Sequence, residues 1–168
     1  VGSSSRQPGC MSPLVVTFLL FHSVPRCLDC SSRDAQVVAR VIAHEAGFDS
    51  PDDEAGIYEV LMRTRVRVRA VSKGRGSLAF AADQYSGVAT GARTPRNDLD
   101  RWSAGLRDEN AYTELVARVT DLFRGEARSP CPVPPHHWGG PMDVPRARRM
   151  GFRRIPCGSS RNDFYLMQ

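Results

Sequence analysis

The chain has 168 residues, of which 41 % are hydrophobic and 24 % are charged, and its formal net charge at pH 7 is +5. This length suits one globular domain with room for a tail. The longest apolar run, residues 13–24, is shorter than the roughly 20 residues that a membrane-spanning helix needs, which excludes that role for it. Arginine supplies 22 of the 23 basic residues. A basic surface suits an anionic polymer, an acidic lipid surface or simple solubility, and charge alone does not choose between them.

Residues 1–32 are predicted to form an N-terminal arm or signal-like segment in front of a domain at residues 33–168. The apolar run PLVVTFLLFHSV at 13–24 has the length of a signal-peptide core, but it lacks the basic residues that precede one. We therefore favour an arm that stays on the protein and packs against the domain or against a neighbouring subunit.

The first predicted helix starts near Asp34, with Ser32 or Asp34 as its cap, and Gly47 lies where a helix terminator is expected. Apolar residues at positions i, i+1, i+4 and i+5 form a stripe that predicts the buried face of this helix: Val37, Val38, Val41 and Ile42.

The second predicted helix covers roughly residues 52–68, after Ser50 as the cap and Pro51 at the first helical position. The residues expected on its inner face are Ile57, Val60, Leu61 and Thr64. Its tail, RTRVRVRAV, alternates arginine with apolar residues, so a strand remains an alternative there. Residues 72–108 are rich in glycine and polar residues and are predicted to be mainly loop.

The third predicted helix runs from Asn110 to the terminator Gly125, and its inward residues are Leu115, Val116, Val119, Leu122 and Phe123. The remainder has too many prolines for helix. It is expected to form a loop and then a hairpin from FRRIPC (152–157) and DFYLM (163–167), joined by the turn GSSRN. The predicted fold class is therefore α+β, mainly helical, with a small C-terminal β-hairpin.

The five cysteines are Cys10, Cys27, Cys30, Cys131 and Cys157. Cys27 and Cys30 form a CxxC pair, but no second pair completes a four-thiolate zinc site. Cys131 and Cys157 flank the C-terminal loop region and are able to pair in an oxidising compartment, which leaves the other thiols unassigned.

Glu45 closes the first predicted helix, and this placement marks it as a candidate acid. A carboxyl group at the end of a helix with a buried face loses water, and we expect that loss to raise its pKa and favour proton donation. A solvent-facing glutamate is the alternative. A zinc-binding HExxH pattern is excluded because position 48 is Phe48. A composite metal site from His44, His136 and Asp143 is disfavoured, and no metal or cofactor is expected.

The order of these features resembles that of the SleB-type cell wall hydrolases, a family of spore-cortex-lytic enzymes and phage lysins. In that family a short helix delivers a catalytic Glu, a Gln-aromatic-Ser/Thr segment lines the cleft, and a terminal strand carries an aromatic pair. The segments IAHEAG (42–47), ADQYSGV (82–88) and NDFYLM (162–167) match these elements. Thr64 replaces the Asn of the Asn-Arg pair that usually ends the second helix. The resemblance spans about residues 36–166.

The resemblance implies a lysozyme-like fold and cleavage between N-acetylmuramic acid and N-acetylglucosamine. Glu45 would act alone as general acid and base, whereas the acids at 52–54 are better explained as the start of the second helix. Substrate positioning would come from Gln84, Tyr85, Ser86, His137 and Trp138.

The expected partner is therefore the peptidoglycan glycan strand, and the expected location is the bacterial envelope or periplasm, or a phage virion. The alternative is a structural or assembly protein of a virion or envelope complex that keeps this fold and binds other subunits through residues 13–30. Nucleic acid is not expected, because the arginines are dispersed rather than interleaved with aromatic residues.

Overall fold

The computed structural model describes residues 22–71, 76–78, 80–82 and 109–168. The elements within these ranges are α1 (Ser32–Glu45), α2 (Pro51–Val71), α5 (Glu109–Arg124), β1 (His137–Gly139), the 3₁₀ helix η1 (Pro141–Asp143), α6 (Val144–Arg149), β2 (Phe152–Ile155) and β3 (Asp163–Met167). The predicted mixture of helices with a small C-terminal sheet is therefore confirmed.

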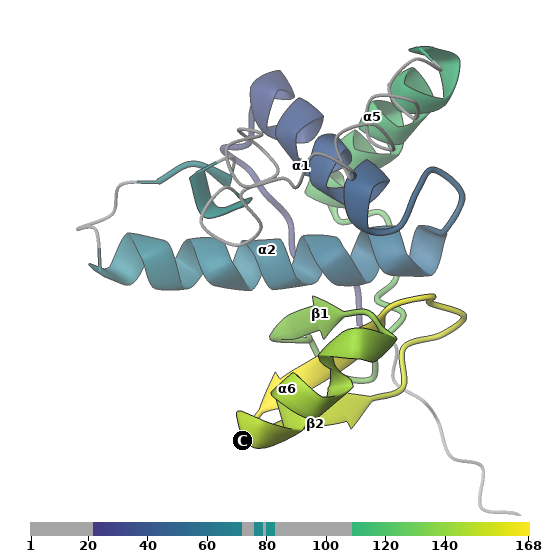
Figure 1. The fold of residues 1–168 in the computed structure, drawn as a ribbon. Helices are drawn as coiled ribbons and strands as arrows, with labels where there is room; N and C mark the ends of the chain where they lie inside the picture. The colour runs from purple at the N-terminus through teal and green to yellow at the C-terminus, as the bar shows by residue number, and fades with distance from the viewer. Residues whose placement is uncertain (1–21, 72–75, 79, 83–108) are drawn as a thin grey trace, which may run out of the picture.

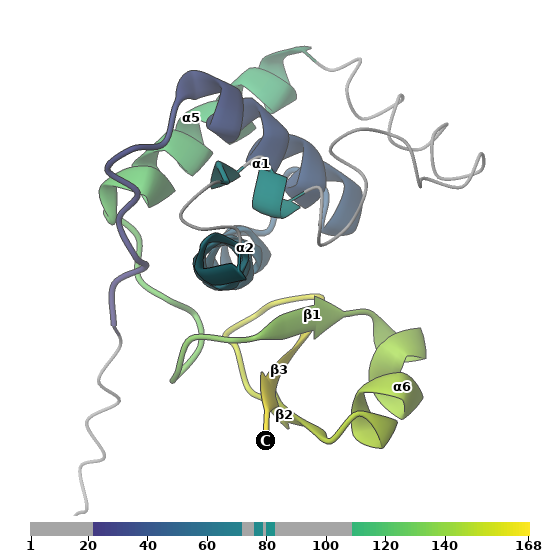
Figure 2. The ribbon, with the colours of Figure 1, turned by 90° about the vertical axis from the view of Figure 1, so that its left-hand side faces the viewer.

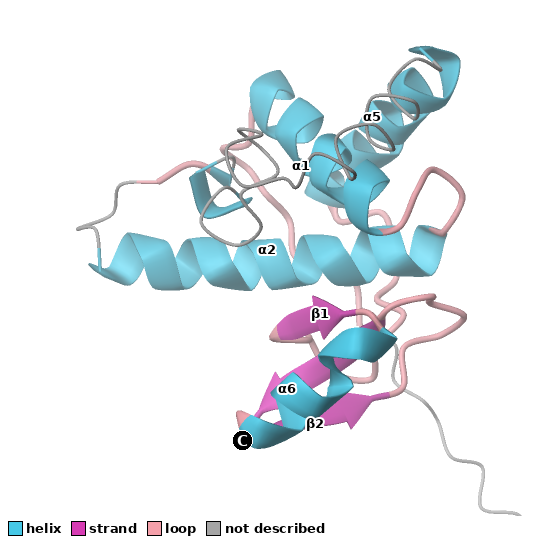
Figure 3. Ribbon diagram, in the orientation of Figure 1, coloured by secondary structure: helices cyan, strands magenta, loops and turns pink. Residues whose placement is uncertain are grey.

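Helix α2 crosses the middle of the molecule, with α1 and α5 on one side and the three strands with α6 on the other (Figure 1). The view along α2 in Figure 2 shows the same two halves above and below it. All strands lie on one side of α2 (Figure 3). In the described part of the chain, no helix is long and apolar enough to cross a membrane.

Helix α1 begins with a capping box rather than with the predicted caps Ser32 or Asp34. Ser31 is the N-cap: its hydroxyl accepts from the Asp34 backbone N–H, and the Asp34 carboxylate accepts from the Ser31 backbone N–H. Val38, Val41 and Ile42 are fully buried, as the stripe predicts. The chain leaves the helix through Gly47, whose φ of +82° is a conformation that favours glycine.

Helix α2 continues to Val71, so the alternative of a strand in its tail is wrong. Arg65 and Arg69 are four residues apart and therefore share a helix face. Both guanidinium groups bind the same Asp29 carboxylate oxygen at 2.7 Å. This tertiary contact holds the alternating sequence in a helical conformation.

Residues 22–31, the described end of the expected arm, pack on the helical core. The backbone N–H of Val24 donates to Ala127 O at 3.1 Å, and that of Cys27 donates to Phe123 O at 2.8 Å. The side chains of Val24 and Cys27 are buried. The Tyr58 hydroxyl on α2 donates to Pro25 O at 2.6 Å.

The sheet has the order β1-β3-β2, with both neighbouring pairs antiparallel. The predicted hairpin is β2 and β3, in which Phe152 pairs with Met167 and Ile155 with Phe164. Strand β1 was not predicted. The expectation that the prolines exclude helix is wrong for α6, because Pro145 occupies its first turn, where the missing N–H needs no partner.

Two acids at the start of α2 attach the sheet to the helices. Asp53 accepts from the backbone N–H groups of Arg161 and Asn162 at 2.8 and 3.0 Å, and Asp52 accepts from that of Ser159 at 2.6 Å. These residues form the turn between β2 and β3. The predicted helix-start acids thus also fix the hairpin.

The disulfide Cys131–Cys157 is the second attachment, and it joins the segment after α5 to the residues that follow β2. The pairing of these two cysteines is confirmed. The structure also pairs Cys27 with Cys30, which the sequence left unassigned.

Candidate active site

A cleft of about 440 Å³ lies where the end of α1 meets the sheet. Helix α2 forms one wall, and β1 with the η1–α6 segment forms another. The lining residues are Glu45, Thr64, Arg67, His136, His137, Trp138, Gly139, Asp143, Arg146, Ala147, Met150, Phe152 and Met167.

Glu45 is the last residue of α1 and is half-buried in this cleft. The indole Nε1–H of Trp138 donates to its Oε2 at 3.2 Å. The side chain of Asn162 donates from Nδ2 to the backbone oxygen of Glu45 at 3.2 Å. Contacts from β1 and from the residue before β3 therefore fix both the side chain and the backbone of Glu45.

His137 and Trp138 are neighbours on β1, and both line the cleft. Trp138 is only 4 % exposed, so its ring supports the wall while its N–H faces Glu45. Burial lowers the pKa of His137, and Arg146 and Arg67 act in the same direction against the opposing charge of Asp143. The imidazole is therefore neutral at pH 7 and suited to hydrogen bonding with an uncharged polar ligand.

Asp143 brings a second carboxylate to the same cleft. Its Oδ2 accepts from the backbone N–H of Gly140 at 3.0 Å, which fixes it at the end of η1. A Cβ on Gly139 would lie 2.9 Å from this side chain, so the backbone of β1 approaches it closely.

Arg67 and Arg146 add positive charge to the lining. Arg67 also donates from Nη2 to the Thr64 hydroxyl at 3.4 Å, a long contact along one face of α2. The cleft thus combines a half-buried carboxyl, a second carboxylate, two imidazoles and two cations. Such a set is suited to acid–base chemistry on a polar substrate that carries some negative charge.

The structure brings together three of the six predicted site residues: Glu45, His137 and Trp138. Gln84, Tyr85 and Ser86 lie outside the described residues, so their predicted role stays a prediction. His136 and Asp143 line the cleft, but His44 is not among the lining residues. Among the residues that are described, no group of three or more metal-ligating side chains is arranged to hold an ion.

Five polar lining residues were not predicted as catalytic or substrate-binding residues: Thr64, Arg67, His136, Asp143 and Arg146. Thr64 had a signal, because the sequence predicted it on the inner face of the second helix. Arg67 lies three residues later on the same helix face, which spacing alone indicates. Asp143 and Arg146 follow irregular glycine- and proline-rich chain, where sequence spacing does not predict direction.

Comparison of the chain with protein-family models, with curated proteins and with solved structures finds no match.

Proposed function

We propose that this protein cleaves the glycan strands of peptidoglycan, as a lytic transglycosylase or a muramidase on a lysozyme-like fold. The observation that carries the proposal is the placement of Glu45. It ends a buried helix, is half-buried in a cleft of about 440 Å³, and accepts a hydrogen bond from the Trp138 indole. General acid catalysis of glycoside cleavage requires a carboxyl group held in such a place.

In the proposed mechanism, Glu45 donates its proton to the glycosidic oxygen as the bond to the anomeric carbon breaks. The Trp138 N–H stabilises the carboxylate that this transfer leaves behind. In a transglycosylase, the muramoyl 6-hydroxyl then attacks the anomeric carbon and Glu45 takes its proton. This route needs no protein nucleophile.

Asp143 supports the hydrolytic alternative. A second carboxylate in the cleft is able to activate a water molecule, which would release a reducing end instead of a 1,6-anhydro product. This role differs from the expectation that Glu45 acts alone, and the product distinguishes the two routes.

The charge of the cleft supports a peptidoglycan substrate. Arg67 and Arg146 offer cations to the carboxylates of the peptide stems, while the neutral His137 suits the sugar hydroxyls. Two disulfides support a location in an oxidising compartment such as the periplasm or the exterior of the cell. The described end of segment 13–30 packs on this chain's own core.

The decisive experiment compares the wild type with Glu45→Gln on purified peptidoglycan, by loss of turbidity and by product mass. Glu126→Gln is the matched control, since it makes the same change at an exposed residue beyond α5. We expect Glu45→Gln to lose at least a hundredfold in rate and Glu126→Gln to keep full activity. Equal activity in all three proteins would refute the role of Glu45. A 1,6-anhydro product identifies the transglycosylase, and a reducing end identifies the muramidase.

A further inference from the structure

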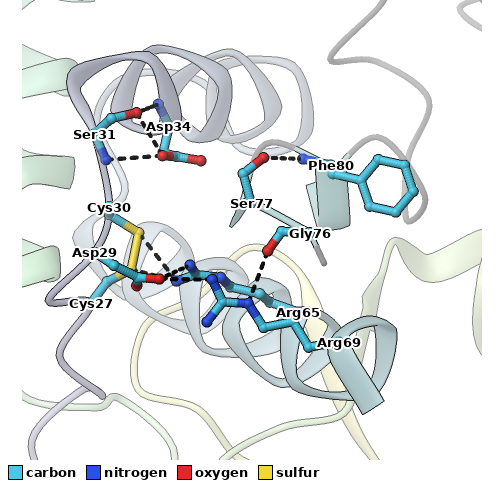
Figure 4. A network of polar contacts seen from close by, with 10 residues as sticks. All are labelled: Cys27, Asp29, Cys30, Ser31, Asp34, Arg65, Arg69, Gly76, Ser77 and Phe80. Atoms are coloured by element: carbon cyan, nitrogen blue, oxygen red, sulfur yellow. Dashed lines mark hydrogen bonds and ion pairs between the residues drawn. A yellow bond between two sulfur atoms is a disulfide. The ribbon is translucent and has the colours of Figure 1, made fainter. Parts of the chain in front are cut away.

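The Cys27–Cys30 disulfide lies directly before α1, against the buried guanidinium of Arg65 on α2 (Figure 4). Cys27 is 6 % exposed and Cys30 is half-buried. Arg65 Nη1 lies 2.8 Å from Cys27 Sγ and 3.6 Å from Cys30 Sγ. This disulfide does not line the cleft and plays no part in the proposed glycan chemistry.

The Arg65 guanidinium is buried, and not all of its N–H groups have a hydrogen-bond partner. The residue is 5 % exposed, and its Nη2 binds the Asp29 carboxylate at 2.7 Å. Its buried Nε has no hydrogen-bond partner within the described chain. Arg69 binds the same carboxylate oxygen, so two cations share one anion and the cluster keeps a charge of about +1.

A thiolate would complete this cluster better than a disulfide does. The sulfur of a disulfide is a neutral, weak acceptor, whereas a thiolate accepts a charge-assisted hydrogen bond from a guanidinium. Arg65 therefore stabilises the reduced state of Cys27 more than the oxidised state, which makes the disulfide easier to reduce.

Two carboxylates near the pair bear on this balance. The Asp29 Oδ1 lies 3.7 Å from Cys27 Sγ and disfavours a thiolate there. Hydrogen bonds from Arg69 and Arg65 lower the pKa of Asp29 to about 2, so it is ionised, but the two arginines outweigh its single charge. The Asp34 carboxylate accepts from the backbone N–H of Ser31 at the start of α1. Arg65 rather than the N-terminus of α1 is therefore the main group that stabilises a Cys27 thiolate.

The disulfide Cys131–Cys157 differs from Cys27–Cys30 in its burial and in its contacts with cations. Cys131 is fully buried and Cys157 is 5 % exposed. In the described part of the chain, no guanidinium donates to either of their sulfurs. The chain thus contains one disulfide suited to permanent cross-linking and one placed against a cation near the surface.

We propose that Cys27–Cys30 is a reversible exchange site for low-molecular-weight thiols. The attacking thiolate, RS⁻, bonds to the more accessible Cys30 Sγ, the Cys27–Cys30 bond breaks, and Cys27 leaves as a thiolate held by Arg65. A second RS⁻ attacks the external sulfur of the Cys30–S–S–R product, which releases RSSR and the Cys30 thiolate. The protein gains two electrons, two thiols lose them, and the reverse sequence restores the disulfide.

The first test titrates the full wild-type chain with glutathione at graded ratios of reduced to oxidised form. Free thiols are alkylated and located by peptide mass spectrometry. We expect the Cys27–Cys30 equilibrium to favour reduction at least tenfold more than that of Cys131–Cys157, equivalent to about 30 mV for a two-electron couple. Equal opening of the two disulfides, or earlier opening of Cys131–Cys157, would overturn the proposal without any variant being needed.

The second test assigns the effect to Arg65. Arg65→Gln removes the cation from both sulfurs. Arg69→Gln is the matched control, because Arg69 binds Asp29 and Gly76 O and its loss leaves the contacts of Arg65 with the sulfurs in place. We expect Arg65→Gln to reduce the equilibrium constant for opening about tenfold and to move the alkylation rate of Cys27 to higher pH, with a smaller change in Arg69→Gln. Circular dichroism confirms folding, and Arg65→Met, which is also uncharged, serves if Arg65→Gln does not fold. Unchanged opening in a folded Arg65 variant would refute the role of Arg65.

Discussion

At the scale of single residues, the site depends on the hydrogen bond that the Trp138 indole N–H donates to Glu45. The ring is buried in β1, so its position is fixed by packing, while Nε1–H contacts Glu45 Oε2 at 3.2 Å. A hydrogen bond between a neutral donor and a carboxylate is stronger than one between two neutral groups. The indole therefore serves both as a wall of the cleft and as the partner of the proposed acid.

Trp138→Phe tests this second role, because it keeps a buried aromatic ring and removes the N–H. We expect cleavage of peptidoglycan to slow about tenfold to a hundredfold, since a hydrogen bond to a charged group contributes roughly 1.5–3 kcal/mol. Steady-state rates on soluble glycan fragments measure the change. Ile155→Val, at a buried sheet residue outside the cleft, controls for a loss of packing of about 1 kcal/mol. Rates within twofold of each other in the two variants would contradict the role of the indole.

Glu59 on α2 is a buried carboxyl group outside the cleft. It is 2 % exposed; the Ser129 hydroxyl donates to its Oε2 at 2.7 Å, and His22 Nε2 lies 2.8 Å from its Oε1. Burial raises its pKa above the ordinary value of 4.5, although Ser129, His22 and the charge of Arg63 act in the opposite direction. The native state thus binds this proton more tightly than the unfolded chain does.

The sign of the resulting pH dependence follows from this difference. As the pH rises from 4.5 through the raised pKa of Glu59, the native state must lose a proton that it favours, so the free energy of unfolding falls. Glu59→Gln does not titrate, and we expect the stability of the wild type relative to this variant to fall over that range. Urea unfolding at several pH values measures the trend. Ser129→Ala should make stability fall more steeply with pH, because the Glu59 carboxylate loses a hydrogen-bond donor. Parallel curves of stability against pH for all three proteins would contradict the assignment of the trend to Glu59.

At the residue scale, the sequence indicated that Glu45, His137 and Trp138 line one cleft, but it did not indicate that Asp143 joins them. Glu45 was predictable because the apolar stripe and Gly47 locate the last turn of α1. Asp143 was not, because its place in the cleft depends on η1 and on the close approach of Gly139, neither of which leaves a periodic signal.

At the scale of elements, α2 is the shared wall of both halves of the molecule. Its residues Ile57 and Leu61 are fully buried, and Gly56 is the point at which the sheet approaches its backbone. A Cβ at Gly56 would lie 2.5 Å from Cζ of Phe164 on β3, which is closer than packed atoms approach. The glycine therefore sets the spacing between helix and sheet.

Gly56→Ala should shift the Phe164 ring and destabilise the fold. Overpacking costs about 1–3 kcal/mol, and the better helix propensity of Ala offsets about 1 kcal/mol of this. We expect a net loss of up to about 2 kcal/mol in the free energy of unfolding in urea. Gly140→Ala is the control, because no atom lies within 4 Å of its added Cβ and its φ of −81° suits alanine. If the clash between residue 56 and Phe164 is the cause, Phe164→Leu should cost less stability in the Gly56→Ala variant than in the wild type. Simple additivity of the two losses would rule out the clash.

Element prediction was accurate for helices with an apolar stripe and for the C-terminal hairpin. Strand β1 was missed because three residues are too few for an alternating pattern, and its pairing with β3 is a contact between distant segments. Helix α6 was missed because the many prolines of the C-terminal segment were interpreted as excluding helix, although Pro145 lies in the first turn, where proline is compatible with helix.

At the scale of the whole molecule, the sheet is held to the helical half by packing, hydrogen bonds and one disulfide. Besides the Phe164 contact, these connections include the acids of α2 bound to the turn at 159–162, the bonds of Trp138 and Asn162 to Glu45, and the disulfide Cys131–Cys157. The cleft lies between these halves, so its shape depends on the same connections.

The cross-link Cys131–Cys157 should therefore contribute more to stability than Cys27–Cys30. The two cysteines are 26 positions apart in the first case and 3 in the second. The entropy of loop closure in the unfolded chain then assigns about 3.5 kcal/mol to the long loop and about 2 kcal/mol to the short one. For a chain of this size these losses correspond to falls in Tm of roughly 10 °C and 5 °C. Thermal unfolding of Cys131→Ala/Cys157→Ala and Cys27→Ala/Cys30→Ala measures both. An equal or reversed order would show that the sheet is held mainly by its non-covalent contacts with the helices.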